Sequence, residues 1–179
     1  MRLTLTEHAG GASAGGPNTI VYDIDADEAH AAPASVAGRA LVWELGEDAS
    51  PDALLSAEVD LDPSTDWLMR CDRVDFQPGG IAYRHTHPGP GIRCLLFGSI
   101  HIDSLGEQHS YGPGEPWFER GPDPVLATTA AEEPSAFVRV MLLPVEWEGR
   151  RTISYVDPAD SDKPKTQKAK IFLEQPVTR

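Results

Sequence analysis

The sequence predicts an all-β protein made of short antiparallel strands. Between residues 66 and 144 the chain is a succession of short runs rich in β-branched and aromatic residues. Each run is separated from the next by Gly, Pro, Ser or Asp, which favour turns. The sequence has no long amphipathic helical pattern and no repeat of solenoid length. This spacing is typical of an antiparallel sandwich or barrel rather than of alternating strands and helices.

The first predicted strands precede this series. Residues 7–17 are rich in Gly, Ala and Ser. We therefore expect a flexible segment over residues 1–18 and a single folded domain over residues 19–179. Structure begins near NTIVYDID, and RALVWEL is a second strand. The run LLSAEVDL fits either a strand or a short helical piece.

The later strands follow in close order. We expect them in WLMRCDRVDF, IAYRHTH, IRCLLFGSIHID, EQHSY, PWFER, VLATTA and AFVRVMLLPV. After a polar loop interrupted by prolines, KAKIFLEQP is a last strand. It can pack on the chain's own sheet or extend the sheet of a neighbouring subunit, and the sequence leaves both arrangements open.

The charge of the chain excludes two classes of partner. The 28 acidic and 15 basic residues give a net charge of -13, which repels nucleic-acid backbones and anionic membranes. No run is long and apolar enough for a signal peptide or a membrane span, so we expect a cytoplasmic protein. Cys71 and Cys94 form no CxxC pattern and are interpreted as buried thiols, with a disulfide left open.

Two histidines separated by one residue carry the chemical signal. Side chains alternate between the faces of a strand, so Tyr83, His85 and His87 are expected on one face. Two imidazoles spaced in this way can converge on one metal ion. The following turn returns the chain, and the same alternation directs Arg93 toward the histidines. A buried arginine needs a carboxylate, either from the protein or from a ligand.

These residues resemble the first motif of the cupin superfamily. In that motif a glycine, an HxH pair, a glutamate and a second glycine follow one another, and Gly80, His85, His87 and Gly98 match it here. The expected glutamate falls on Gly91.

The second cupin motif is less complete. Pro113 and Gly114 keep its turn, while its histidine falls near Pro124 or Val125. The resemblance covers residues 71–144, and it implies a double-stranded β-helix, the cupin jelly-roll barrel, with extra N- and C-terminal strands. It also implies a homodimer formed through sheet edges.

The resemblance further implies a divalent metal inside the barrel: Fe, Mn, Ni, Cu or Zn. His85 and His87 are its predicted ligands, and Glu119 is the predicted third, because the PWFER strand lies in the region of the second motif. If Glu119 instead pairs with Arg93, only two protein ligands remain; if Glu119 binds metal, Arg93 can hold an anionic substrate. Tyr83 is a candidate proton donor or substrate-orienting group.

Two functions follow from this set of residues. The first is a metal-dependent, oxygenase-like enzyme that acts on a small carboxylate-bearing molecule, with Tyr83 and Arg93 as catalytic residues. The second is a non-catalytic barrel that binds a small organic acid with little or no metal.

Overall fold

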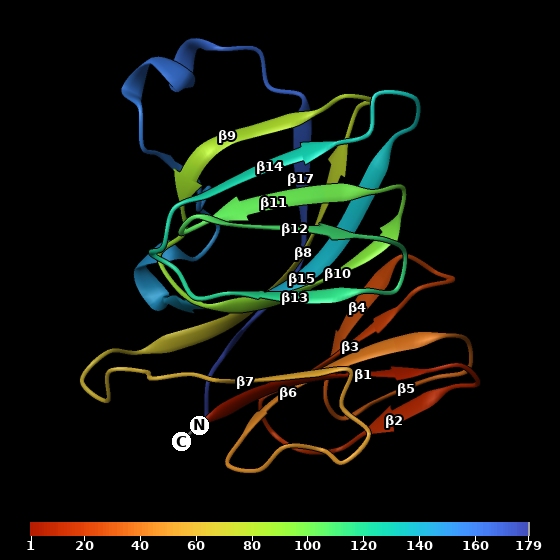
Figure 1. Ribbon diagram of the computed structural model, residues 1–179. Coiled ribbons are helices and arrows are strands. Elements are labelled where there is room, and N and C mark those ends of the chain that lie inside the picture. Colours follow the sequence, from red (N-terminus) through yellow and green to blue (C-terminus); the bar gives the residue numbers. More distant parts are fainter. Residues whose placement is uncertain (179) are drawn as a thin grey trace.

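The computed structural model describes residues 1–178 and shows a chain built from β-strands, with two short 3₁₀ helices (Figure 1). The strands form three antiparallel sheets of five strands each and one two-stranded ribbon. Two of the large sheets face each other as a barrel, and the third, from the N-terminal part of the chain, lies beside the barrel (Figure 1).

Strands β8 to β15 form the barrel. Their bounds are β8 (Trp67–Phe76), β9 (Ile81–Thr86), β10 (Gly91–Phe97), β11 (Ile100–Ser104), β12 (Glu107–Tyr111), β13 (Pro116–Glu119), β14 (Val125–Thr129) and β15 (Ser135–Pro144). One sheet has the order β13-β10-β15-β8 and the other β12-β11-β14-β9. This is the strand order of an eight-stranded jelly roll, in which two Greek keys wind around one core. The predicted all-β double-stranded β-helix is therefore confirmed.

The C-terminal part of the chain extends both barrel sheets. It contains η1 (Val145–Trp147), β16 (Ser154–Tyr155), η2 (Pro158–Asp162) and β17 (Gln167–Pro176). Strand β16 pairs with β9, and β17 pairs with β8 along most of its length. The sequence left two arrangements open for the last strand, and it packs on its own sheet.

The N-terminal sheet has the order β4-β3-β6-β1-β7. Its strands are β1 (Arg2–His8), β3 (Thr19–Asp23), β4 (Glu28–Ala31), β6 (Ala40–Gly46) and β7 (Leu55–Glu58), while β2 (Ala12–Ala14) and β5 (Ala34–Val36) form the ribbon. The flexible segment predicted for residues 1–18 is wrong. Strand β1 pairs on both sides, and its Leu3 and Leu5 are fully buried. The small residues that suggested flexibility form a tight ribbon instead.

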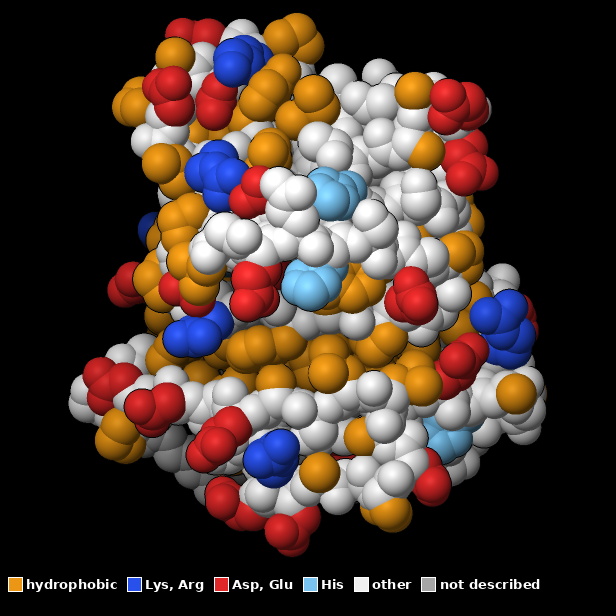
Figure 2. Space-filling view, in the orientation of Figure 1, with side chains coloured by type: hydrophobic (Ala, Val, Ile, Leu, Met, Phe, Trp, Pro, Cys, Tyr) orange, Lys and Arg blue, Asp and Glu red, His pale blue; other side chains and the backbone are white. Residues whose placement is uncertain are grey.

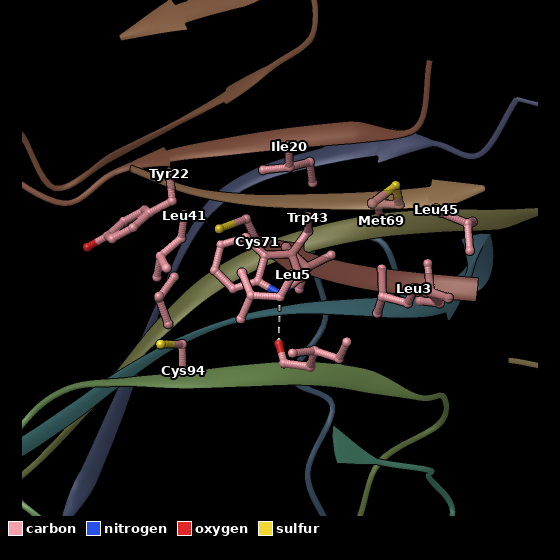
Figure 3. Close-up of a cluster of buried hydrophobic side chains, with 14 of the residues drawn as sticks. Leu3, Leu5, Ile20, Tyr22, Leu41, Trp43, Leu45, Met69, Cys71 and Cys94 are labelled. Carbon is pink, nitrogen blue, oxygen red and sulfur yellow. Dashed lines mark hydrogen bonds between the residues drawn. The ribbon is translucent and has the colours of Figure 1, made fainter. Parts of the chain in front are cut away.

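The main hydrophobic core joins this sheet to the outer face of the barrel (Figure 3). Trp43 is fully buried there, and its indole N–H donates to the Ile92 carbonyl at 3.1 Å. Cys71 and Cys94 are free, buried thiols in the same cluster, as predicted. Figure 2 shows a band of hydrophobic side chains along this junction. Within residues 1–178, no helix has the length and apolar character needed to span a bilayer.

Candidate functional site

A cavity of about 440 Å³ lies inside the barrel. One end is apolar and is lined by Val74, Phe76, Ala82, Ile102, Val125 and Phe137. The other end holds His85, His87, Asp72, Arg139 and Glu119. Residues 145–155, which we call the cover, close the seam between the two sheets beside this polar end and contribute residues 149–153 to the cavity wall.

His85 and His87 face each other at the polar end and are 4% and 5% exposed. The Nδ1 atom of His85 lies 2.7 Å from the Tyr83 carbonyl oxygen, and Nδ1 of His87 lies 3.3 Å from the Thr152 carbonyl oxygen. A carbonyl only accepts, so each Nδ1 carries the ring proton of a neutral imidazole. The two Nε2 atoms, 3.2 Å apart, then direct lone pairs toward each other.

Burial keeps both imidazoles neutral. Desolvation lowers the pKa of His85 below its ordinary value, although the Glu119 carboxylate acts in the opposite direction. The pKa of His87 lies well below its ordinary value, first because of burial and then because of the nearby Arg139 and Arg93 guanidinium groups. Neutral imidazole is the form that binds metal ions.

A bulge in β9 changes which residues face the cavity. The four residues of β9 from Ala82 to His85 lie opposite the three residues of β14 from Val125 to Ala127, and such an extra residue shifts the alternation of faces. Ala82 and His85 therefore both line the cavity, and Tyr83 does not. The Tyr83 ring instead lies 4.3 Å from the Lys163 ammonium. The prediction that Tyr83 shares the histidine face is wrong for this reason.

A row of charged side chains crosses the sheet beneath the histidines. Asp72 on β8 lies opposite Arg139 on β15, which lies opposite Arg93 on β10. Arg139 donates to both carboxylate oxygens of Asp72, at 2.6 and 3.3 Å. Arg93 is fully buried and faces the cavity side of β10, as the alternation of side chains along the strand predicted. Its Nη2 lies 2.7 Å from Glu119 Oε2. Each arginine thus has a carboxylate of its own.

The Arg93 contact is an ion pair rather than an aligned hydrogen bond. Among the described residues, neither Nε nor Nη2 of Arg93 has a hydrogen-bond partner of suitable geometry. Burial lowers the pKa of Arg93 to about 10, while Glu119 acts to raise it. The Arg93 guanidinium therefore depends on the Glu119 carboxylate for its neutralisation.

The Glu119 carboxylate lies between Arg93 and the histidine pair. Its Oε1 accepts from the Trp117 indole N–H at 2.9 Å, and its Oε2, which contacts Arg93, lies 4.0 Å from His87 Nε2. The carboxylate is therefore close to the histidines but already has a cation. The sequence left open whether Glu119 pairs with Arg93 or binds metal. The structure contains the Glu119–Arg93 ion pair. The role of Glu119 as a third metal ligand stays a prediction.

The position of the missing cupin glutamate explains this arrangement. Gly91 lies directly opposite Glu119 in the β10–β13 ladder. A Cβ atom on Gly91 would lie 2.5 Å from the Val140 carbonyl oxygen and 3.0 Å from Arg93 Nη1. The chain has no room for a side chain at residue 91, and it carries a carboxylate on the neighbouring strand instead.

The two histidines fit a metal ion as a pair. Metal–nitrogen bonds of about 2.0–2.1 Å place two adjacent ligand atoms roughly 2.9–3.4 Å apart at tetrahedral or octahedral angles, and the observed separation is 3.2 Å. Hydrogen bonds from Nδ1 to carbonyl groups are the usual support of such ligands. Within residues 1–178, however, no three His, Cys, Asp or Glu side chains are grouped for metal binding.

Sequence reasoning missed Arg139, Asp72 and Thr152. Arg139 is the charged residue in the otherwise apolar run SAFVRVMLLP. A charge in such a buried run signals a polar site, so Arg139 could have been found. Asp72 lies among other charged residues of β8, and its burial has no marker in the sequence. Thr152 acts through its backbone carbonyl from a loop, and no sequence signal reveals that contact.

No protein-family model and no curated protein sequence matches this chain. Among solved structures, it is similar to the polyketide cyclase RemF from Streptomyces resistomycificus, with 20% identity and a TM-score of 0.40. That match covers 54% of this chain and 64% of the cyclase, less than two thirds of its length. A salicylate 1,2-dioxygenase from Pseudaminobacter salicylatoxidans matches with 10% identity and a TM-score of 0.42, over 96% of this chain and 70% of the dioxygenase. These similarities concern the fold alone. The strand order of the two barrel sheets is that of the jelly roll found in the cupin fold.

Proposed function

We propose that this chain is a metal-dependent enzyme that acts on a small molecule, with His85 and His87 as the protein ligands of one divalent transition metal. The observation that carries the proposal is the pair of facing Nε2 atoms, 3.2 Å apart, with both Nδ1 protons held by carbonyl groups. Two buried lone pairs directed at each other repel unless a cation lies between them. Their neutral state is favoured by the lowered pKa of both rings.

The surrounding residues prepare the site for a bound molecule. The apolar end of the cavity excludes water and accepts an apolar body. The pairs Asp72–Arg139 and Glu119–Arg93 neutralise the two guanidinium groups, so they reduce the positive potential that would repel a metal ion. A bound metal would supply Lewis-acid or oxygen-activating chemistry, and oxygenase-like chemistry on a carboxylate-bearing molecule is the reaction that the cupin resemblance favours.

A second candidate is a binding barrel with little or no metal. One observation favours it: Arg139 Nη1 lies 3.3 Å from His87 Nε2, so this guanidinium can donate to the lone pair that a metal would use. Together with the Glu119–Arg93 ion pair, this contact supplies partners to the polar groups without an ion.

Metal titration distinguishes the two candidates. We expect iron(II), manganese, nickel, copper or zinc to bind with one site per chain in isothermal titration calorimetry, and the site to vanish in the His85→Ala, His87→Ala double variant. The matched control is His101→Ala, His109→Ala, which removes two histidines outside this cavity. Stoichiometry far below one, unchanged in the double variant, would favour the binding barrel.

A Glu119→Gln variant tests the predicted third ligand. If Glu119 contributes a bond to the metal, the variant should bind metal about tenfold more weakly or less, a loss typical of changes at or next to a ligand. If the carboxylate serves only Arg93, metal affinity should stay within about twofold while thermal stability falls.

A further inference from the structure

One wall of the cavity is positively charged, although the chain as a whole is acidic. Arg150 and Arg151 of the cover line the cavity together with Lys165, and the Arg151 and Lys165 side chains both contact the Tyr155 ring. We call these three residues the cationic wall. In a chain of net charge -13, a local group of three cations adds positive potential to this part of the cavity.

The cationic wall is not neutralised from within. In the described part of the chain, the Arg150 side chain takes part in no hydrogen bond or ion pair. Lys165 donates to two backbone carbonyl oxygens, at 2.9 and 2.8 Å, rather than to a carboxylate. Arg151 donates to the Tyr155 hydroxyl at 2.9 Å. These cations differ from Arg93 and Arg139, each of which forms an ion pair with a carboxylate inside the barrel.

The cationic wall is held in place by a buried arginine. Arg70 is 1% exposed and donates to Glu174 Oε1 at 2.6 Å, to the Arg150 carbonyl at 2.7 Å and to the Trp147 carbonyl. Glu174 also accepts from the backbone N–H of Gly149. The backbone that carries Arg150 is therefore fixed against β8 and β17, although the Arg150 side chain is exposed.

Another part of the cavity wall is apolar. Phe76, Phe137 and Val74 line it, together with the small side chains of Ala82 and Ala127. A molecule with its charged group at the cationic wall can place an apolar body against these residues.

We propose that the cavity binds an amphipathic anion, whose acid group contacts the cationic wall and whose apolar or aromatic body fills the end lined by Phe76 and Phe137. The sequence assigned the acid group to Arg93, but that guanidinium is fully buried against Glu119. The proposal rests on the proposed function only in placing the molecule in the same cavity, and it does not require a bound metal.

The test uses two probes that differ in charge. Naphthalene-2-carboxylate and naphthalene-2-methanol have the same ring system, and only the first is an anion at neutral pH. In calorimetric titrations of metal-free protein at low salt, we expect the carboxylate to bind about tenfold more tightly than the alcohol. The Arg150→Gln, Arg151→Gln double variant should lose that preference and keep its affinity for the alcohol, because both side chains are exposed and neither belongs to the hydrophobic core.

Two further variants locate the binding. Arg2→Gln, Arg39→Gln changes the net charge by the same amount on the N-terminal sheet, and it should leave both affinities unchanged. Ala127→Phe fills the apolar end and should weaken both probes about tenfold or more. Equal binding of the two probes, no binding of either, or an equal loss in the control variant would overturn the proposal. The metal titrations of the His85, His87 variant report on the proposed function separately.

Discussion

At the scale of single residues, the site is defined by buried groups whose charges and protons are fixed by their neighbours. His85 and His87 are buried and neutral, with carbonyl groups on their Nδ1 sides. Arg139 and Asp72 form a pair that is almost fully removed from solvent. Each of these arrangements has a measurable consequence for stability.

The histidine pair predicts a loss of stability in mild acid. Both pKa values are lowered by folding, so below about pH 6.5 the unfolded chain takes up protons that the folded, metal-free chain refuses. The free energy of unfolding should fall with decreasing pH, by up to about 1.4 kcal/mol per pH unit for each histidine. Urea unfolding between pH 7 and pH 5 measures this slope. A His85→Gln, His87→Gln variant with the same slope would contradict the assignment.

The Asp72–Arg139 pair predicts that one substitution is worse than two. Arg139→Leu leaves the Asp72 carboxylate buried without a cation, and we expect a loss of about 3–5 kcal/mol. The double variant Asp72→Leu, Arg139→Leu removes both charges and should recover most of that loss. Chemical unfolding of the three proteins checks the order, and additive losses would show that the two side chains act independently.

At the scale of elements, the sequence predicted strands well and their irregularities poorly. The barrel strands and the inward direction of Arg93 follow from alternation and turn residues. Tyr83 was misplaced because one extra residue in β9 reverses the alternation, and a bulge has no marker in this sequence. The flexible segment over residues 1–18 was mispredicted because it was inferred from the Gly, Ala and Ser of residues 7–17, while the alternation of apolar and polar residues in RLTLTEH, which forms β1, was not used.

The cover is the element whose attachment can be tested directly. Arg70→Lys keeps a positive charge at this position but loses the planar fork that reaches Glu174 and two carbonyl groups of the cover at once. We expect faster amide hydrogen exchange in residues 147–153, with β8 and β15 still protected. Exchange that rises equally in all three places would instead report a general loss of stability.

At the scale of the whole molecule, two β-structures share one core. The N-terminal sheet covers the outer face of the barrel sheet that carries the charged row, with Trp43 bound to the Ile92 carbonyl between them. The faces of β8, β10 and β15 are therefore covered on one side by this sheet, while the cavity lies on the other. Such support holds the charged side chains in position.

The homodimer implied by the cupin resemblance stays a prediction. Strand β17 already pairs with β8 of its own chain and leaves its other edge unpaired. We expect the N-terminal strands or the KAKIFLEQP segment, which forms most of β17, to cover an edge of the partner. Size-exclusion chromatography with light scattering at micromolar concentration measures the mass, and a value of 19.4 kDa would contradict a dimer.

The carbonyl of Thr152 links the cover to the chemistry of the barrel. This carbonyl holds the proton of His87 on Nδ1 and leaves the lone pair of Nε2 to the cavity. The same segment contributes residues 149–153 to the cavity wall. One short loop therefore both bounds the space that a molecule would occupy and determines which nitrogen of His87 faces that molecule.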